Sequence, residues 1–389
     1  MAFALAAGVT YLVGEPSDSP HLVAGPGTGR IPTSGTLPAA GASVPAFDLW
    51  SDPVFPTLSV GYAIERHLTA AGPSEALARS EDGGRTWHLV GDFPFPSGYS
   101  EVQFISVSTG YAFGPAGLAV TRDGGARWVE GQSIGGRLER VVPIGSDVWA
   151  TFDVCHGPPE PATPCTVHLA ISTDSGLRFS TALAPAPLPA SFGGGDILAR
   201  ISDDAAYVVS YGPTGGGLAL THDGGATWAR LADPCSSWPL VDLAAPAPGL
   251  LWMICGGAPA AGGSAKAVFQ SADGGRTWRA EAYTGFGPAA GPLARRAPFG
   301  RISYEGQLSQ LATIDPVAAW IGVSGVGVLV TRDHGRRWSL VRGMSRAAAA
   351  GGAGVGVTFN DARHGWAIEF RRGVWRTSDG VDWRLVDGT

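Results

Sequence analysis

Short apolar runs alternate with polar, glycine-rich turns along most of this chain. Residues 76–78 (Ala-Leu-Ala) and 328–330 (Val-Leu-Val) are two such runs, each shortly before a polar octet. Two strand-like runs on either side of a glycine-rich turn are typical of a β-hairpin. No long stretch has apolar residues at the i, i+3, i+4, i+7 spacing of an amphipathic helix. The pattern therefore predicts an all-β fold built from hairpins.

The polar octet is a repeat, and its copy at residues 271–278 reads SADGGRTW. Its recurrent Asp and closing aromatic residue are Asp82 and Trp87, Asp123 and Trp128, Asp174 and Phe179, Asp223 and Trp228, Asp273 and Trp278, Asp333 and Trp338, and Asp379 and Trp383. The Asp and the leading Ser or Thr can accept hydrogen bonds from turn N–H groups, and the glycines allow positive φ. Because each Asp belongs to its own hairpin, the copies would lie apart in space. We interpret the octet as a structural fastener.

An aromatic strand precedes each octet, for example residues 61–64 (Gly-Tyr-Ala-Ile) and 365–368 (Gly-Trp-Ala-Ile). The octets recur with a period of about 50 residues, which is typical of a propeller or a β-array. Residues 354–386 contain four strand-like runs separated by short turns, as expected for one propeller blade. The sequence therefore predicts a seven-bladed β-propeller of four-stranded antiparallel blades, with one octet hairpin per blade.

Two segments precede the repeats. Residues 1–14 are apolar and uncharged, but they are too short to cross a bilayer, which takes about 20 residues. We interpret them as the remnant of a signal peptide or membrane anchor, so a membrane tether is one expectation. Residues 15–46 are rich in Pro, Gly, Ser and Ala, which predicts a linker. The propeller is expected over residues 47–389.

The charge and the cysteine content of the chain limit the partners and the compartment that we expect for the protein. The net charge is −6, which gives no reason to expect nucleic-acid binding. Four cysteines allow three pairings, of which the local one, Cys155 with Cys165 and Cys235 with Cys255, is the simplest. Two disulfides favour an oxidising compartment, and hence export. There is no C-x-x-C pair and no Cys/His cluster with zinc spacing, so neither a metal nor a cofactor is predicted.

The octets resemble the Asp-box, or BNR, repeat of sialidases, sortilin-type receptors, two-propeller xyloglucanases and the photosystem II stability/assembly factor family. Seven single-box blades, each with an aromatic strand before the box, are most similar to the assembly-factor family. This resemblance implies a non-enzymatic, extracytoplasmic scaffold that binds a protein or peptide, with a glycan as another possible partner, and we expect a monomer. An Arg-rich surface is implicated in partner binding in that family, which directs attention to Arg295, Arg296, Arg301, Arg371 and Arg372.

A glycoside hydrolase of Asp-box type is the alternative function. The Arg-Ile-Pro motif of sialidases occurs at residues 30–32, but within the leader and with no strand after it. Other glycosidases need two facing carboxylates. The carboxylates considered outside the boxes are Asp48, Glu65, Glu101, Asp153, Asp196, Asp203, Asp204, Asp315, Asp361 and Glu369. Glu65 and Glu369 follow the aromatic strand in the first and last blades, which are neighbours in a ring, so they are the first pair to test.

Overall fold

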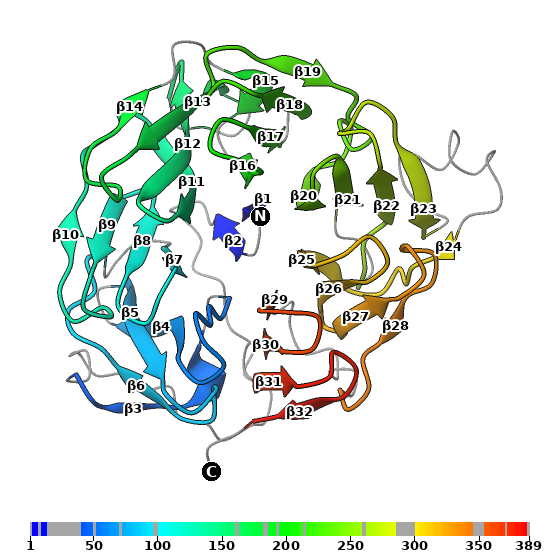
Figure 1. The fold of residues 1–389 in the computed structure, drawn as a ribbon. Coiled ribbons are helices and arrows are strands. Elements are labelled where there is room, and N and C mark those ends of the chain that lie inside the picture. Colours follow the sequence, from blue (N-terminus) through cyan, green and yellow to red (C-terminus); the bar gives the residue numbers. More distant parts are fainter. Residues whose placement is uncertain are drawn as a thin grey trace.

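The computed structural model contains seven β-sheets arranged as blades around a central axis (Figure 1). It describes residues 2–6, 9–13, 40–49, 52–69, 72–95, 100–158, 160, 163–181, 186–191, 194–212, 215–258, 262–284, 300–344, 354–369 and 372–386. The prediction of an all-β, seven-bladed propeller is confirmed. Within the described residues the only helix is the short 3-10 turn η1 (Ala46–Asp48). None of the described segments forms a helix long and apolar enough to cross a membrane.

Six blades run outwards from the axis in chain order. Each of these blades has four antiparallel strands. Blade 2 contains β7 (Glu101–Phe104), β8 (Gly110–Gly114), β9 (Gly117–Thr121) and β10 (Val129–Glu130), blade 3 contains β11 (Arg137–Ile144), β12 (Asp147–Cys155), β13 (Pro164–Ser172) and β14 (Ser180–Thr181), and blade 4 contains β16 (Gly195–Arg200), β17 (Ala206–Tyr211), β18 (Gly217–Thr221) and β19 (Ala229–Leu231). Blade 5 contains β20 (Leu240–Ala247), β21 (Leu250–Gly256), β22 (Lys266–Ser271) and β23 (Arg279–Tyr283), blade 6 contains β25 (Gln307–Thr313), β26 (Ala319–Ser324), β27 (Gly327–Thr331) and β28 (Ser339–Leu340), and blade 7 contains β29 (Val355–Phe359), β30 (Gly365–Glu369), β31 (Gly373–Thr377) and β32 (Trp383–Leu385). The third and fifth blades each gain one more strand, β15 (Ala186–Ser191) beside β13 and β24 (Gly300–Arg301) parallel to β23.

Blade 1 takes its outermost strand from the N-terminal side of the chain. It contains β4 (Gly61–Thr69), β5 (Gly72–Ser80) and β6 (Trp87–Leu89), with β3 (Ser43–Val44) paired outside β6. Leu49 and Val54 lie inside β4 and form isolated bridges to it, with Glu65 and Tyr62 respectively. The last blade is built from β29 to β32 alone. Among the described strands none is shared between blades 7 and 1, and side-chain packing joins these two blades.

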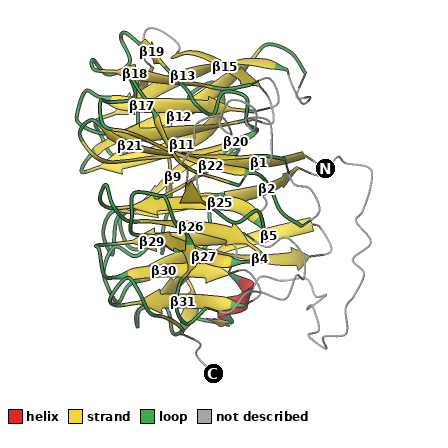
Figure 2. Cartoon of the chain, turned by 90° about the vertical axis from the view of Figure 1, so that its right-hand side faces the viewer, coloured by secondary structure: helices red, strands yellow, loops and turns green. Residues whose placement is uncertain are grey.

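A separate antiparallel pair, β1 (Ala2–Ala6) and β2 (Val9–Val13), lies near the axis. β1 contacts β16, and β2 contacts β25. Figure 1 shows the pair in the middle of the ring, and Figure 2 shows it from the side. The interpretation of residues 1–14 as a leader remnant stays a prediction.

Glycines at the start of three aromatic strands make room for a Phe of the same blade. A Cβ on Gly110 would lie 2.4 Å from the Phe104 ring. Gly61 has the same relation to Phe55 at 2.3 Å, and Gly365 to Phe359 at 2.6 Å. With that space clear, Phe104 stacks on Tyr62 of the preceding blade, with ring centroids 3.5 Å apart. The Gly-aromatic-Ala pattern of the sequence therefore couples neighbouring blades.

Both predicted disulfides are present, which confirms the local pairing. Cys155 and Cys165 lie opposite one another in the ladder between β12 and β13. Cys235, in the connection before β20, is joined to Cys255 on β21. The described residues include no free cysteine. The second disulfide ties the chain entering blade 5 to that blade's second strand.

Candidate functional site

The box turns lie at one end of the propeller, and both disulfides lie at the other. In every blade an N–H group of the box donates to a carbonyl of the turn between that blade's first two strands, as Gly124 N does to Ser108 O (2.8 Å) and Gly274 N to Gly249 O (2.9 Å). We call this end the box face. The inner strands begin at the other end, which also holds both disulfides, and we call it the opposite face. The box face is thus occupied by fastening turns.

Hydrogen bonds within the box use the polar atoms of its Asp and Ser. Ser271 Oγ accepts from Gly275 N (2.8 Å) and donates to Asp273 Oδ1 (2.8 Å). Asp273 also accepts from the backbone N–H of Thr277 (2.9 Å) and from its hydroxyl (2.6 Å). The Thr277 hydroxyl, followed by its N–H, lowers the pKa of Asp273 to about 2. The carboxylate is therefore committed to its own turn.

The arginines suggested by the family resemblance do not come together among the described residues. Arg295, Arg296 and Arg371 lie outside them. The exposed Arg301 is on β24, where its N–H donates to the carbonyl of Arg336 (2.8 Å). Arg372 donates to Glu369 from the loop after β30 (2.9 and 3.0 Å). Their role in binding stays a prediction.

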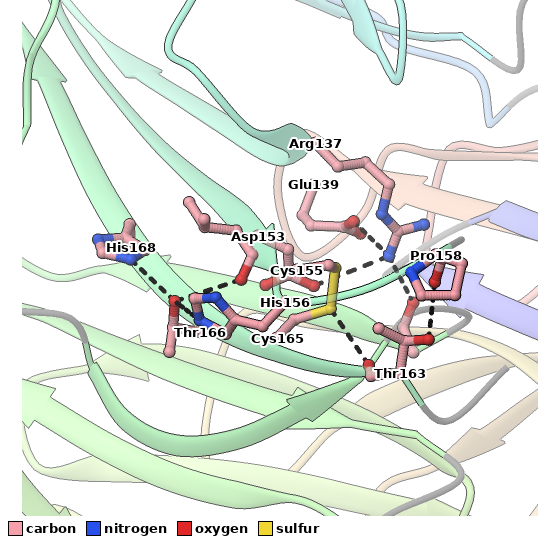
Figure 3. Close-up of a disulfide and its surroundings, with 12 residues drawn as sticks. Arg137, Glu139, Asp153, Cys155, His156, Pro158, Thr163, Cys165, Thr166 and His168 are labelled. Carbon is pink, nitrogen blue, oxygen red and sulfur yellow. Dashed lines mark hydrogen bonds and ion pairs between the residues drawn. A yellow bond between two sulfur atoms is a disulfide. The ribbon is translucent and has the colours of Figure 1, made fainter. Parts of the chain in front are cut away.

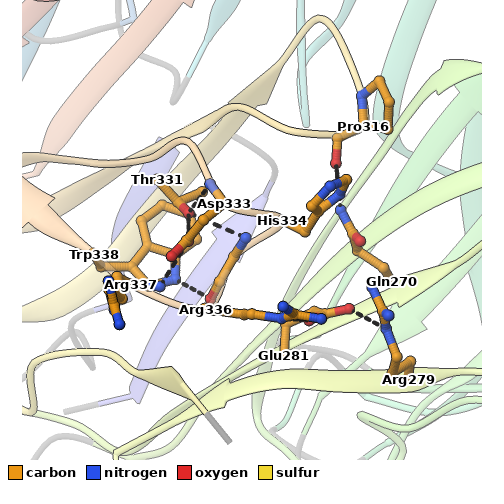
Figure 4. Close-up of polar contacts among 11 residues, drawn as sticks. Gln270, Arg279, Glu281, Pro316, Thr331, Asp333, His334, Arg336, Arg337 and Trp338 are labelled. Atoms are coloured by element: carbon orange, nitrogen blue, oxygen red, sulfur yellow. Dashed lines mark hydrogen bonds and ion pairs between the residues drawn. The ribbon is translucent and has the colours of Figure 1, made fainter.

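Figure 4 shows how arginines of the sixth box lie against blade 5. Glu281 on β23 is buried and forms ion pairs with Arg279 and, at 3.5 Å, with Arg336. His334 Nδ1 lies 3.0 Å from the carbonyl oxygen of Pro316, which also accepts from Gln270. These contacts join two blades, and they leave Arg279 and Arg336 more than half exposed.

Glu65 and Glu369 are both buried, but they have different partners. Burial, reinforced by the charge of Asp48, raises the pKa of Glu65 to about 8. Glu369 pairs with Arg372 and accepts a hydrogen bond from the indole N–H of Trp375 (3.2 Å). The pair remains a hypothesis for catalysis, although the contacts of Glu369 give it a clear structural role.

A larger group of charged side chains gathers at the axis, near the start of the inner strands. We call it the axial cluster, and it consists of Asp52, Glu101, Arg137, Glu139, Arg140, Asp153, Asp196 and Asp242. All but Asp153 lie on the innermost strand of blades 1 to 5, and Asp153 is paired with Arg137 across β11 and β12. Four of its carboxylates, from four blades, raise the pKa of the buried Tyr211 hydroxyl, after burial itself. Side chains from separate blades therefore converge on one region.

Two arginines of β11 hold part of this cluster together. Arg140 Nη1 lies 2.6 Å from Glu101 Oε2 on the neighbouring blade. Arg137 Nη2 lies 2.6 Å from Glu139 Oε1 and 3.8 Å from Asp153 Oδ2. Figure 3 shows this guanidinium beside the Glu139 carboxylate, close to the disulfide of blade 3. Asp242 instead accepts backbone N–H groups from Leu243 (2.8 Å) and from Leu311 on blade 6 (2.7 Å).

Burial raises the pKa of several carboxyl groups in the axial cluster. The pKa of Glu139 is raised to about 8, with Arg137 opposing the shift and Asp153 and Glu101 adding to it. Burial raises the pKa of Asp153 to about 6 against the effect of Arg137, and that of Asp242 to about 6. Burial raises the pKa of Asp196 well above its usual range. At neutral pH the cluster therefore contains protonated and ionised carboxyl groups together.

The sequence indicated only part of this cluster. Glu101, Asp153 and Asp196 were among the candidate carboxylates, whereas Asp52, Glu139 and Asp242 were not. One signal was available, because an acidic residue stands at or near the start of the innermost strand in five consecutive blades. In the part of the chain that the structure describes, no group of three or more His, Cys, Asp or Glu residues is suited to hold a metal ion.

Comparison with known proteins places the fold among solved propellers. No family profile matches the chain, and no curated protein matches it. The structure is similar to that of YCF48 bound to D1 peptide, with 17% sequence identity and a TM-score of 0.56 over 90% of this chain and 99% of that one. At this identity the similarity concerns the fold.

Solved enzymes also occur among the similar structures. The GH74 xyloglucanase from Xanthomonas campestris shares 17% identity over 88% of this chain and 67% of its own, with a TM-score of 0.42. A PL25 ulvan lyase shares 12% identity over 88% of this chain and 96% of its own, with a TM-score of 0.48. The chain thus resembles an Asp-box-type seven-bladed propeller, an architecture that includes a protein solved with a bound peptide.

Proposed function

We propose that this protein is an exported, non-enzymatic propeller scaffold that binds a protein or peptide partner at the opposite face, over the axial cluster. The main support for this proposal is that charged side chains from five blades converge at the end of the axis away from the boxes. A rigid ring with functional groups at one end is a common arrangement for a binding site. Two disulfides support an oxidising, extracytoplasmic environment.

The contacts within the cluster favour binding over hydrolysis. Arg140 holds Glu101, and two backbone N–H groups hold Asp242. Carboxylates fixed in this way connect neighbouring blades and are not placed to exchange protons with a sugar. The similar fold of a propeller solved with a bound peptide is consistent with a peptide partner, although a fold alone does not define a function.

One observation favours a glycoside hydrolase as the second candidate. Glu139 and Asp153 lie on the same Arg137 nitrogen, with pKa values raised to about 8 and about 6. A protonated acid beside an ionised carboxylate is the division of roles that glycosidases require.

Two screens separate these functions. The full-length protein would be applied to an array of random peptides, and to a panel of chromogenic glycosides. We expect saturable binding to a subset of peptides and no glycoside turnover. Turnover abolished by Glu139→Gln, Glu65→Gln or Glu369→Gln would instead establish a hydrolase. The exposed Glu81→Gln serves as the matched control because Glu81 lies in a box turn.

A further inference from the structure

The carboxylates of the axial cluster outnumber its cations. Six carboxyl groups face two guanidinium groups, and both guanidinium groups are already engaged, Arg140 with Glu101 and Arg137 with Glu139 and Asp153. Asp242 is satisfied by backbone N–H groups. The hairpin of β1 and β2 contains no charged side chain, so it brings no counter-charge to β16. None of these contacts involves Asp196.

Asp196 and its neighbours have unused hydrogen-bonding atoms. Asp196 is 0% exposed, and neither of its carboxylate oxygens has a hydrogen-bond partner. The Tyr211 hydroxyl, 1% exposed on the adjacent strand, also has none, and neither has Asp153 Oδ1. Burial raises the pKa of Asp196, and Asp153 and Glu139 add to that shift. Burial also raises the pKa of Tyr211, with Asp196 among the carboxylates that add to it. Buried polar atoms normally find partners, since leaving one without costs free energy.

A cation with several N–H donors would suit these acceptor atoms. The negative surroundings exclude an anion, and the described residues provide no metal-binding group. An ammonium or guanidinium group supplies three to five donors that carboxylates and a hydroxyl can accept. Arg137 shows that a guanidinium fits this environment, and its side chain, 25% exposed, connects the cluster to the surface.

We propose that the axial cluster binds the side-chain cation of an Arg or Lys residue of the partner, with Asp196 and Asp153 as acceptors. This inference rests on the proposed binding function and specifies the chemistry of the partner. Without the cation, Asp196 keeps a proton, since its surroundings are Glu139, Asp153, Arg137 and the Tyr211 hydroxyl. Binding of the cation displaces that proton. Affinity should therefore increase as pH rises.

The first test uses a small probe with a neutral isostere. The probes are Nα-acetyl-L-arginine amide and Nα-acetyl-L-citrulline amide, called arginine amide and citrulline amide below, whose acetylated α-amino groups carry no charge. Each would be titrated into the full-length protein by calorimetry, in two buffers of different ionisation enthalpy. We expect saturable binding of arginine amide with proton release, and none of citrulline amide. Asp196→Asn should weaken binding about tenfold or more. Asp203→Asn, which removes an exposed carboxylate of the same blade at the box face, should not.

Stability measurements keep the test decisive. Asp196→Asn should fold and be at least as stable as the wild type, because it removes a buried carboxyl group that has no partner. Asp153→Asn provides a second variant and should weaken binding without unfolding the protein, because Arg137 keeps its closer contact with Glu139. Equal binding of citrulline amide, or unchanged affinity in both variants, would overturn the cation site.

A peptide arm separates this inference from the proposed function. Peptides selected on the array would be remade with citrulline for Arg and acetyl-lysine for Lys. Loss of binding supports the cation site. Peptide binding that ignores these replacements overturns the inference and leaves the proposed function standing. Binding of arginine amide without any peptide binding would support the cation site and overturn the proposed peptide-binding function.

Discussion

Phe55 stacks on Trp366, with ring centroids 4.1 Å apart and ring planes inclined by 8°. The first residue belongs to blade 1 and the second to blade 7, so this contact closes the ring. The indole N–H of Trp366 also donates to the carbonyl of Gly83 in the first box (3.1 Å), and Gly84 packs on the same indole. The junction between blades 1 and 2 has the same arrangement, because Tyr62 of blade 1 stacks on Phe104 and lies close to Gly124 of blade 2. Blades 7 and 1 therefore pack together in the same way as blades 1 and 2.

Truncation at the ring closure should destabilise the whole propeller. Phe55→Ala removes a buried ring from the core that joins the first and last blades, and we expect a loss of about 3–5 kcal/mol in the free energy of unfolding. Denaturant unfolding measures this loss. Phe104→Ala removes the matching ring at an internal junction. Because no strand crosses between blades 7 and 1, only Phe55→Ala should also increase the radius of gyration in X-ray scattering.

Gly110→Ala should destabilise the protein although the change adds one methyl group. The new Cβ would meet the Phe104 ring at 2.4 Å and force that ring away from Tyr62. Overpacking of this kind costs about 1–3 kcal/mol. Gly135→Ala is a poor control because of its positive φ, so the double variant Gly110→Ala/Phe104→Leu is preferred. Gly110→Ala should cost less in the Phe104→Leu background than in the wild type, and an equal cost in both backgrounds would contradict the crowding argument.

Lys266, the only lysine in the chain, should be essential for blade 5. Its buried ammonium group donates to the carbonyls of Ser264, Ser303, Tyr304, Glu305 and Gly306, at 2.8–3.3 Å. Burial lowers the pKa of Lys266 to about 7, whereas this set of carbonyl oxygens favours the charged form. Lys266→Met leaves the carbonyls without a donor, and we expect a loss of about 3–5 kcal/mol.

The matched variant Lys266→Arg tests the geometry of that carbonyl site. A planar guanidinium does not fit where one ammonium point charge is surrounded by carbonyls, so Lys266→Arg should also destabilise. Thermal unfolding of both variants would measure the effect. Wild-type stability of Lys266→Met would show that the carbonyls are satisfied in another way.

The buried Glu65 should make stability depend on pH. Its pKa is about 8 in the folded protein, against an ordinary value of 4.5. Between these values the unfolded chain is ionised while the folded protein holds a proton, so stability falls as pH rises through this range. Glu65→Gln removes that contribution and should stabilise the protein at neutral pH by about 2–4 kcal/mol. A pH series of denaturant curves measures it, and an unchanged slope would contradict the assignment.

Reduction of the second disulfide should weaken the entry to blade 5. Cys235 and Cys255 are both 0% exposed and 20 residues apart, and a loop of this size is stabilised by about 3 kcal/mol when closed. The Cys235→Ser/Cys255→Ser variant should lose stability of this order. It should also become insensitive to a reductant at that site. A variant as stable as the wild type would show that packing around Trp238 is sufficient.

Much of the fold could be predicted because each blade contains one copy of a short sequence repeat, whose contacts are local. Each box closes a hairpin with hydrogen bonds inside one octet, as Ser271, Asp273 and Thr277 do, so counting boxes gave the number of blades. The local cysteine pairs were likewise predictable, since each joins residues close in sequence. The extra strands β15 and β24 were not predicted, because they lack a box and pair only at a blade's edge.

The candidate site depends on contacts between blades, which no local pattern contains. Glu139 and Asp242 look like ordinary strand residues in the sequence, and only the closed ring turns both toward the axis. The same is true of Asp196, whose unpartnered carboxylate results from the positions of Arg137 and Arg140 on another blade. The sequence by itself determined the blade, its fastener and the blade count, because those interactions lie within a few residues of one another. Tertiary structure alone decided which carboxylates share the axis, because burial and long-range charge arise only once the blades surround it.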